Sequence, residues 1–100
     1  MKSQVFDFCL PPDHPVFAGH FPGMPIVPGV MLLDAVLHAI ADAAGPASWR
    51  IATAKFLNPL APGETASVRC DIGDDGMARF EIAADGRVIA SGSLAAETAA

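Results

Sequence analysis

Apolar and polar residues alternate along much of the second half of the chain. Alternation places successive side chains on opposite faces of a strand, so it predicts half-buried strands at residues 65–72 and 77–83. Short apolar runs bounded by proline, glycine or aspartate predict three more strands, at residues 4–10, 49–57 and 87–94. The pattern therefore predicts a strand-rich chain.

One long segment has helical character instead, residues 28–44. Pro28 suits a first helical turn, whose N–H groups lack intrahelical partners, and the Gly45-Pro46 pair supplies a stop. The segment is apolar on almost every side. Its three polar exceptions recur every four residues and share one stripe: Asp34, His38 and Asp42. Other elements must therefore cover most of this helix.

Turn sequences indicate how the strands connect. Residues 73–76 and 84–86 have the glycine and aspartate content of hairpin turns, and residues 58–63 form a longer, proline-containing connection. One strand, a buried helix and four further strands predict an α+β fold, with an antiparallel sheet covering the helix. We expect a single domain over residues 1–96 and a frayed tail at residues 97–100.

Composition and charge narrow the possible partners. The chain is 52% apolar and only 17% charged, too few charged side chains to cover so small a domain, which indicates an oligomer. The formal charge is -5 and the six Lys and Arg residues are scattered, so nucleic acid binding is disfavoured.

The remaining compositional signals concern metals, thiols and membranes. The three histidines lack the spacing of a metal site, so we expect none, and Cys9 and Cys70 are expected to be reduced thiols. The first residues contain no cleavable signal, and the longest apolar stretch is short and interrupted by charges. We therefore expect a soluble, cytoplasmic protein that does not enter membranes.

The loop before the helix carries the candidate chemistry. Residues 13–28 are rich in proline and glycine yet also apolar, which predicts a stiff, packed loop rather than a solvated linker. His20 lies in this loop and can act as a general base near neutral pH. Gly29 opens the helix, where unpaired N–H groups can stabilise an oxyanion. Asp34, facing an apolar pocket, can retain a proton to donate.

These residues resemble the 3-hydroxyacyl-acyl-carrier-protein dehydratases of the FabA/FabZ type. The resemblance centres on Phe17-Ala18-Gly19-His20-Phe21-Pro22, Pro28-Gly29-Val30 and Asp34-Ala35, and extends more loosely over Lys55-Phe56-Leu57-Asn58-Pro59-Leu60-Ala61-Pro62-Gly63. It implies a hot-dog fold, in which an antiparallel sheet of about five strands wraps one long central helix. It also implies a homodimer, or a higher oligomer, whose active sites are shared between subunits.

The same resemblance assigns roles to individual residues. His20 removes the C2 proton, the Gly29 N–H binds the thioester oxygen, and Asp34 of the other subunit assists loss of the C3 hydroxyl as water. Phe21 and Val30 are candidate substrate-binding residues. The substrate is carried on phosphopantetheine, either of an acyl carrier protein or of coenzyme A, and no cofactor is needed. The implied pathway is fatty acid synthesis or related lipid, polyketide or polyene synthesis.

Three alternatives stay open at this level. Aspartate stands at position 34 in a loop context typical of the glutamate-using enzymes, so double-bond isomerisation is undecided. His38 is one turn from Asp34 and would favour the charged carboxylate if the two pair. A hot-dog thioesterase and a non-catalytic acyl-binding or dimerisation module remain competing functions.

Overall fold

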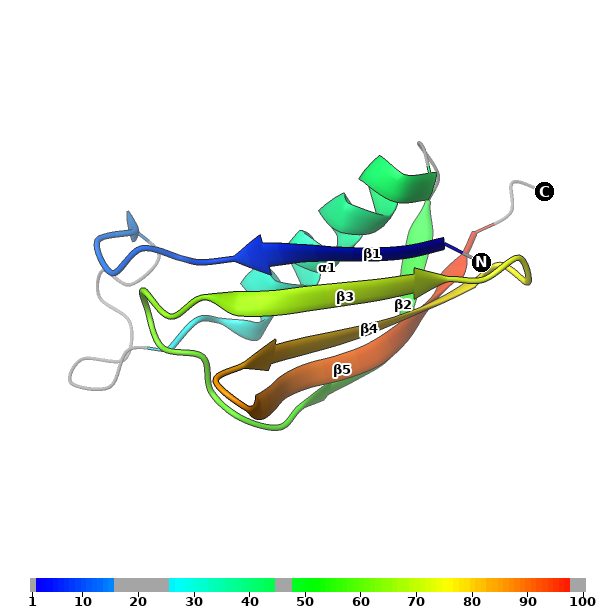
Figure 1. Cartoon of the computed structure of the whole chain (residues 1–100). Coiled ribbons are helices and arrows are strands. Elements are labelled where there is room, and N and C mark those ends of the chain that lie inside the picture. The colour runs from blue at the N-terminus through cyan, green and yellow to red at the C-terminus, as the bar shows by residue number, and fades with distance from the viewer. Residues whose placement is uncertain (1, 16–25, 45–47, 98–100) are drawn as a thin grey trace.

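The computed structural model describes residues 2–15, 26–44 and 48–97, which form five strands and one helix (Figure 1). The elements in chain order are β1 (Lys2–Phe8), α1 (Gly29–Ala44), β2 (Trp49–Phe56), β3 (Ala66–Ile72), β4 (Met77–Ala84) and β5 (Arg87–Ala96). The expected α+β class and the order of its elements are confirmed. Most predicted boundaries differ from the observed ones by one or two residues.

The five strands form one antiparallel sheet in the order β1-β3-β4-β5-β2. β1 pairs with β3 along its whole length, from Lys2 opposite Ile72 to Phe8 opposite Ala66. The strand predicted at residues 4–10 therefore begins and ends two residues too late, because β3 offers no partner beyond Ala66. β1 and β2 are the two edge strands of the sheet.

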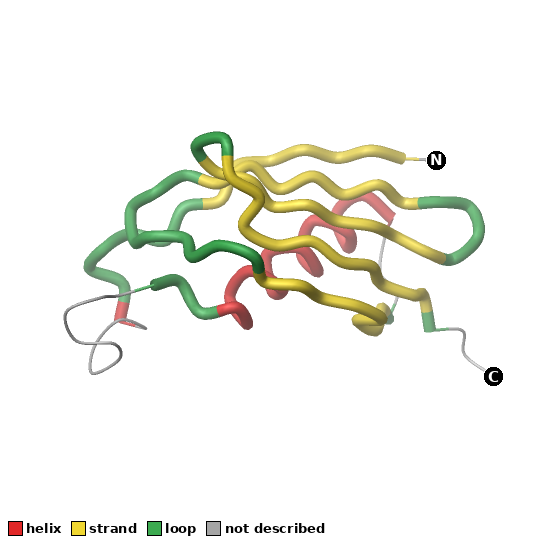
Figure 2. The backbone as a smooth tube through the Cα atoms, turned by 90° about the horizontal axis from the view of Figure 1, so that it is seen from below, coloured by secondary structure: helices red, strands yellow, loops and turns green. Residues whose placement is uncertain are grey.

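The sheet is curved, and the helix lies along its hollow side (Figure 2). The strand register shifts between Ile51 and Thr53 in β2, and between Ile82 and Ala83 in β4. Such irregularities bend a strand and increase its twist. β5 extends beyond its predicted end to Ala96, and the N–H of Glu97 then donates to the Ser48 carbonyl at 2.8 Å. Residues 98–100 of the expected tail lie outside the described residues.

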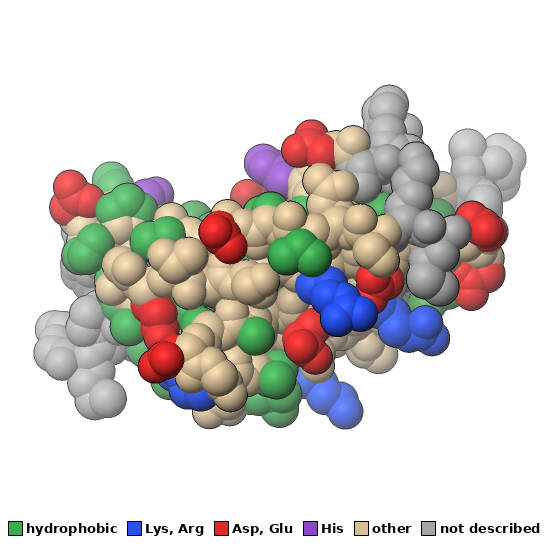
Figure 3. All heavy atoms as spheres, viewed as in Figure 1, with side chains coloured by type: hydrophobic (Ala, Val, Ile, Leu, Met, Phe, Trp, Pro, Cys, Tyr) green, Lys and Arg blue, Asp and Glu red, His purple; other side chains and the backbone are tan. Residues whose placement is uncertain are grey.

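The outer face of the sheet is polar. Cross-strand register places Arg69 opposite Glu81, and Asp71 opposite Arg79, so charges of both signs alternate across β3 and β4 (Figure 3). The Arg69 Nε atom also lies 3.5 Å from a carboxylate oxygen of Asp71. Interspersed charges of this kind keep a strand face solvated without creating a patch of one sign.

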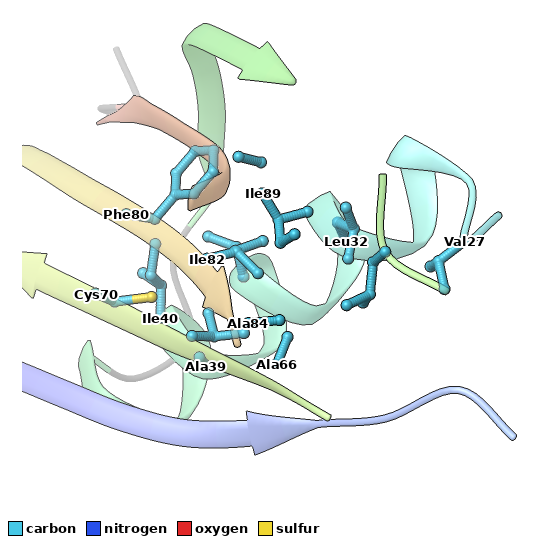
Figure 4. Packing of buried hydrophobic residues seen from close by; sticks show 14 of the residues in the cluster. Val27, Leu32, Ala39, Ile40, Ala66, Cys70, Phe80, Ile82, Ala84 and Ile89 are labelled. Atoms are coloured by element: carbon cyan, nitrogen blue, oxygen red, sulfur yellow. The ribbon is translucent and has the colours of Figure 1, made fainter. Parts of the chain in front are cut away.

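The inner face and one side of the helix form the core (Figure 4). Burial alternates along β3 and β4, as the sequence pattern predicts. The most deeply buried side chains include Val36 and Ile40 of α1, Val68 of β3 and Ile82 of β4. Each such side chain contributes about 1.5–3 kcal/mol to folding. Among the described residues no helix combines the length and apolar content needed to cross a bilayer.

The helix covers only part of the sheet. It packs against β1 and β3, whereas the residues of β2 after Trp49 are all exposed. Large apolar side chains are exposed at five described positions: Val5, Val30, Ile51, Phe56 and Leu57. Three of these belong to β2 or follow it directly. The apolar surface left bare in one chain is therefore concentrated near the β2 edge.

Gly92 of β5 has no room for a side chain. A Cβ atom there would clash with the Thr53 carbonyl oxygen of β2 and lie within 2.8 Å of the Phe80 ring. The carbonyl belongs to the backbone and cannot turn aside. We expect Gly92→Ala to lower the free energy of unfolding by about 2 kcal/mol or more, measured by urea denaturation. Ser91→Ala, on the neighbouring position, is the control, and equal stabilities for the two variants would contradict the packing.

Candidate functional site

An apolar cleft of about 400 Å³ opens beside the start of α1. One wall comes from the segment before the helix and its first turns, and contains Ile26, Val27, Gly29 and Leu32. The other wall comes from residues 56–60, at the end of β2 and in the connection to β3. Clefts lined by apolar groups beside a few polar donors are typical small-molecule sites. The cleft thus joins the two blocks that carry the family resemblance.

The helix begins at Gly29, and the N–H of Met31 donates to the Pro28 carbonyl at 3.0 Å. This bond closes the first turn, and the unpaired N–H groups at the start of a helix point out along its axis. Groups in that position carry partial positive charge and favour an anionic ligand atom. Since Gly29 lines the cleft, the arrangement can place a carbonyl oxygen near a helix N-terminus.

Phe56 covers Gly29 in the single chain. A Cβ atom at position 29 would lie 2.9 Å from the edge of the Phe56 ring, so a larger residue there would displace this ring. The ring is 53% exposed and has room to swing outward. Access of a substrate carbonyl to the helix start therefore depends on the position of Phe56, which the sequence does not reveal.

The connection between β2 and β3 is held at several points by hydrogen bonds. The N–H groups of Leu57 and Asn58 donate to the Ile89 carbonyl at 2.8 and 3.3 Å, and the Asn58 side chain donates to the Val88 carbonyl. At the other end, the Gly63 N–H donates to the Leu10 carbonyl at 2.8 Å. This wall of the cleft is thus anchored to β5 and to the segment after β1.

An ion pair between Arg87 and Glu64 joins the start of β5 to the same connection, outside the cleft. Glu64 also accepts a hydrogen bond from the Ala61 N–H at 3.2 Å. This backbone bond and, next, the Arg87 side chain lower the pKa of Glu64 below its ordinary value, because both favour the charged carboxylate. The Arg87 guanidinium donates in addition to the Pro59 carbonyl at 3.3 Å.

Asp34 lies elsewhere on the helix, in a depression of about 350 Å³ between α1 and β1. Phe6 and Phe8 of β1 form the apolar side of this depression. The His38 Nε2 atom is 3.8 Å from the Asp34 carboxylate, so the expected neighbour is present. Both side chains are largely exposed, 62% for Asp34 and 78% for His38. Burial of Asp34, which the acid role needs, is therefore not supplied by one chain.

The structure does not bring all predicted site residues together. Gly29 lines the cleft, whereas Asp34 lines the depression, and no described residue lines both hollows. Val30, expected to bind substrate, is 70% exposed and does not belong to the cleft lining. His20 and Phe21 lie outside the described residues, so their predicted roles stay predictions.

The two cysteines are free, as expected, and differ in environment. Cys9 is exposed, whereas Cys70 is buried in the sheet, where desolvation raises the pKa of its thiol to about 11. Cys70 is therefore a protonated core residue at neutral pH. Within residues 2–15, 26–44 and 48–97, no group of three or more His, Cys, Asp or Glu side chains is arranged to hold a metal ion.

The sequence did not single out Phe56 in the cleft lining, nor the Arg87 and Glu64 pair outside the cleft. Phe56 falls in the second block of the resemblance, which gave it no individual role. Arg87 and Glu64 are 23 positions apart, and no local pattern links them. Only the Asp85-Gly86 turn signal indicates that Arg87 begins a strand.

Comparison with known proteins gives a consistent match. The family described as ApeI-like, ApeI dehydratase, matches residues 1–93. The 3-hydroxyacyl-[acyl-carrier-protein] dehydratase FabZ of Thermomicrobium roseum is 35% identical over 94 residues, which cover 85% of this chain and 62% of that protein. FabZ of Cereibacter sphaeroides is 32% identical, covering 96% of this chain and 68% of the relative. The chain thus spans about two thirds of the length of these relatives.

Solved structures share the architecture. The dehydratase heterocomplex ApeI:P from Xenorhabdus doucetiae aligns with a TM-score of 0.86 at 27% identity, over 96% of this chain and 88% of that one. An uncharacterised protein from Erwinia carotovora aligns with a TM-score of 0.77 at 28% identity, over 95% and 82% of the two chains. The fluoroacetyl-CoA-specific thioesterase FlK, at 15% identity and a TM-score of 0.68, shares the fold alone. These matches confirm the hot-dog fold.

Loss of the Glu64 charge should change how stability depends on pH. A carboxylate whose pKa is lowered by folding stabilises the protein above its unfolded pKa, here 4.5, and loses that contribution as pH falls through the lowered value. We expect Glu64→Gln to reduce the free energy of unfolding at pH 7 and to differ less from the wild type at about pH 3, below the ordinary pKa of the carboxyl. Urea denaturation at both pH values measures this, and a difference that persists unchanged at low pH would contradict it.

Proposed function

Because the chain belongs to the ApeI-like dehydratase family, we propose that it dehydrates 3-hydroxyacyl thioesters to trans-2-enoyl thioesters. The structural observation that carries the proposal is the apolar cleft at the N-terminus of α1, lined by Gly29. A thioester oxygen that becomes negatively charged as the C2 proton leaves is stabilised by helix N–H groups in this position. The cleft is apolar beyond that point and suits an acyl chain.

The proposed reaction divides between two side chains. His20 removes the C2 proton as general base, which delocalises the electron pair toward the thioester oxygen near Gly29. The pair then returns to form the C2–C3 double bond as the C3–O bond breaks. Asp34, protonated, gives its proton to the departing hydroxyl, which leaves as water. The atoms balance without an oxidant, a reductant or a cofactor.

We infer that each active site is shared between two copies of the chain. The Asp34 carboxylate and the Gly29 cleft lie in separate hollows of one chain, and the Asp34 side chain is 62% exposed there. We propose that the second copy docks at the β2 edge, where Phe56 also lines the Gly29 cleft. It would extend the sheet at a free strand and cover the exposed Ile51 and Phe56.

The acyl group is proposed to arrive on phosphopantetheine. FabZ proteins are named as dehydratases of acyl-carrier-protein substrates, which supports a carrier protein as the donor here. The cleft would receive the acyl and thioester part of such a substrate, so an assay has to distinguish the carrier protein from coenzyme A. Comparing the kcat/KM values for the same acyl group on both carriers identifies the physiological donor.

The activity is tested in the reverse direction, by hydration of a crotonyl thioester. We expect the wild type to be active, and His20→Ala and Asp34→Asn each to lower kcat by a factor of about 100 or more while the oligomeric state is unchanged. Full activity in either variant would remove that residue from the mechanism. Thiol release without hydration would identify a thioesterase, and binding without turnover a non-catalytic module.

Mixing the two inactive variants tests the shared site. In a mixed dimer, one site combines both substitutions and the other combines the two intact residues. After free exchange of subunits at equal amounts, half of the dimers are mixed, so about a quarter of wild-type activity should return. No recovery, with exchange shown by mass-tagged subunits, would mean that His20 and Asp34 act within one chain.

The β2 edge is tested by charge. We expect Ile51→Asp to convert the dimer to a monomer, since it places a charge in the apolar surface between two β2 strands, and to abolish hydration activity. Light scattering after size exclusion measures the mass. Val5→Asp, at an apolar site that is more exposed than Ile51 (62% against 39%) and lies on the opposite edge strand, is the control and should remain dimeric.

A monomeric wild-type chain would overturn the homodimer. It would favour a partner of different sequence at the β2 edge; the similar protein from Xenorhabdus doucetiae is described as a dehydratase heterocomplex. Dissociation of Val5→Asp together with an intact Ile51→Asp dimer would move the interface to β1.

A further inference from the structure

Arg87 stands at the end of a tight hairpin that fixes its direction. Asp85 and Gly86 both have positive φ angles, 49° and 74°, and Arg87 pairs with Ala84 across the turn. Two central residues with positive φ are the geometry of a type I′ hairpin, which matches the twist of its strands. The first side chain of β5 is thereby held against the connection between β2 and β3.

The Arg87 guanidinium binds two parts of that connection at once. One terminal nitrogen donates to the Pro59 carbonyl at 3.3 Å, and the other forms the ion pair with Glu64. Both charged side chains are partly buried, which strengthens the pair relative to one in open solvent. The planar fork of arginine suits two acceptors, whereas a lysine ammonium acts as a single point charge.

Leu60 links the connection between β2 and β3 to the start of α1. The Leu60 side chain is almost fully buried and lines the cleft, and its carbonyl accepts the Val27 N–H at 2.9 Å. Val27 precedes the Pro28 and Gly29 pair that opens the helix. A continuous path of contacts therefore runs from Arg87 through residues 59–64 to the helix N-terminus.

From this path we propose that Arg87 is a positioning residue for the acyl thioester, acting through Pro59, Glu64 and Leu60 on the cleft wall and the helix start. It touches neither the cleft nor the reacting atoms. The proposal rests on the proposed function for its substrate. What Arg87 is proposed to determine is the position of Leu60 in the cleft wall and of Val27, and this position can be measured without turnover.

The fold does not depend on the contacts of Arg87 with Pro59 and Glu64 alone. Leu57 and Asn58 remain bonded to β5, and Gly63 remains bonded to Leu10, when Arg87 is replaced. Both ends of the connection stay tethered while its middle loses its external contact. A substitution at Arg87 should therefore shift the cleft wall in a protein that still folds.

The test compares Arg87→Gln, Arg87→Lys and the control Arg79→Gln, in which an exposed arginine of the outer sheet face is replaced. We expect Arg87→Gln to raise KM for the crotonyl thioester about three- to tenfold with kcat changed much less, because bound substrate still meets the same catalytic groups. The KM of Arg87→Lys should lie between those of the wild type and Arg87→Gln, since lysine keeps the charge of arginine but not its planar fork of donors. Arg79→Gln should match the wild type.

Two measurements separate positioning from a loss of folded protein. Affinity for an unreactive S-alkyl pantetheine thioether should fall by the same factor as KM rises. Amide hydrogen exchange at Val27 should accelerate, because its acceptor Leu60 is less firmly held. Unchanged KM, unchanged thioether affinity and unchanged Val27 exchange would overturn the proposal, as would a fall in kcat alone that follows the folded fraction.

Failure of the proposed function gives a different result. In that case the wild type itself hydrates no crotonyl thioester. The Val27 exchange rate in Arg87→Gln against Arg79→Gln then decides whether Arg87 positions the helix start. An active wild type with an indistinguishable Arg87→Gln variant overturns the positioning role and leaves the dehydratase intact.

Discussion

The packing of one apolar side of α1 against the hollow face of the sheet is the interaction on which the rest of the structure depends. Leu32, Val36 and Ile40 are buried on the helix, opposite the inward residues of β3 and β4. Their burial fixes the helix axis and so places Gly29 at the end of β2, beside the connection to β3. The position of the cleft is thus a consequence of core packing, although the cleft itself lies at the edge of the core.

Apolar packing is non-directional, and the described core contains no buried polar or charged residue. Directional contacts that shape the cleft are found at the periphery instead. Hydrogen bonds from Asn58, Gly63 and Val27 hold the connection between β2 and β3, and the Arg87 and Glu64 pair closes it. The fold and the geometry of its cleft therefore rest on different kinds of interaction, which is why peripheral substitutions can alter the cleft while the fold remains.

A single chain leaves this architecture incomplete on one side. The helix packs toward β1 and β3, so β2 exposes Ile51 and Phe56 together with a free row of backbone groups. Asp34 is exposed as well, but it lies on the β1 side of the helix. Covering the β2 edge with a second copy would remove apolar surface from solvent and bring further groups to the cleft. The partial cover that a single helix gives to five strands accounts for the bare β2 edge.

The sequence by itself determined the secondary structure and the fold class, because alternation in β3 and β4 and the apolar run of α1 are local patterns that burial enforces. Its Pro28-Gly29 pair also located the helix start, and Asp34 and His38 were placed one turn apart correctly. Tertiary structure alone decided that β1 ends at Phe8, that Phe56 covers Gly29, and that Arg87 meets Glu64. Each of these depends on strand register or on contacts between residues distant in the sequence, and no local periodicity records such contacts.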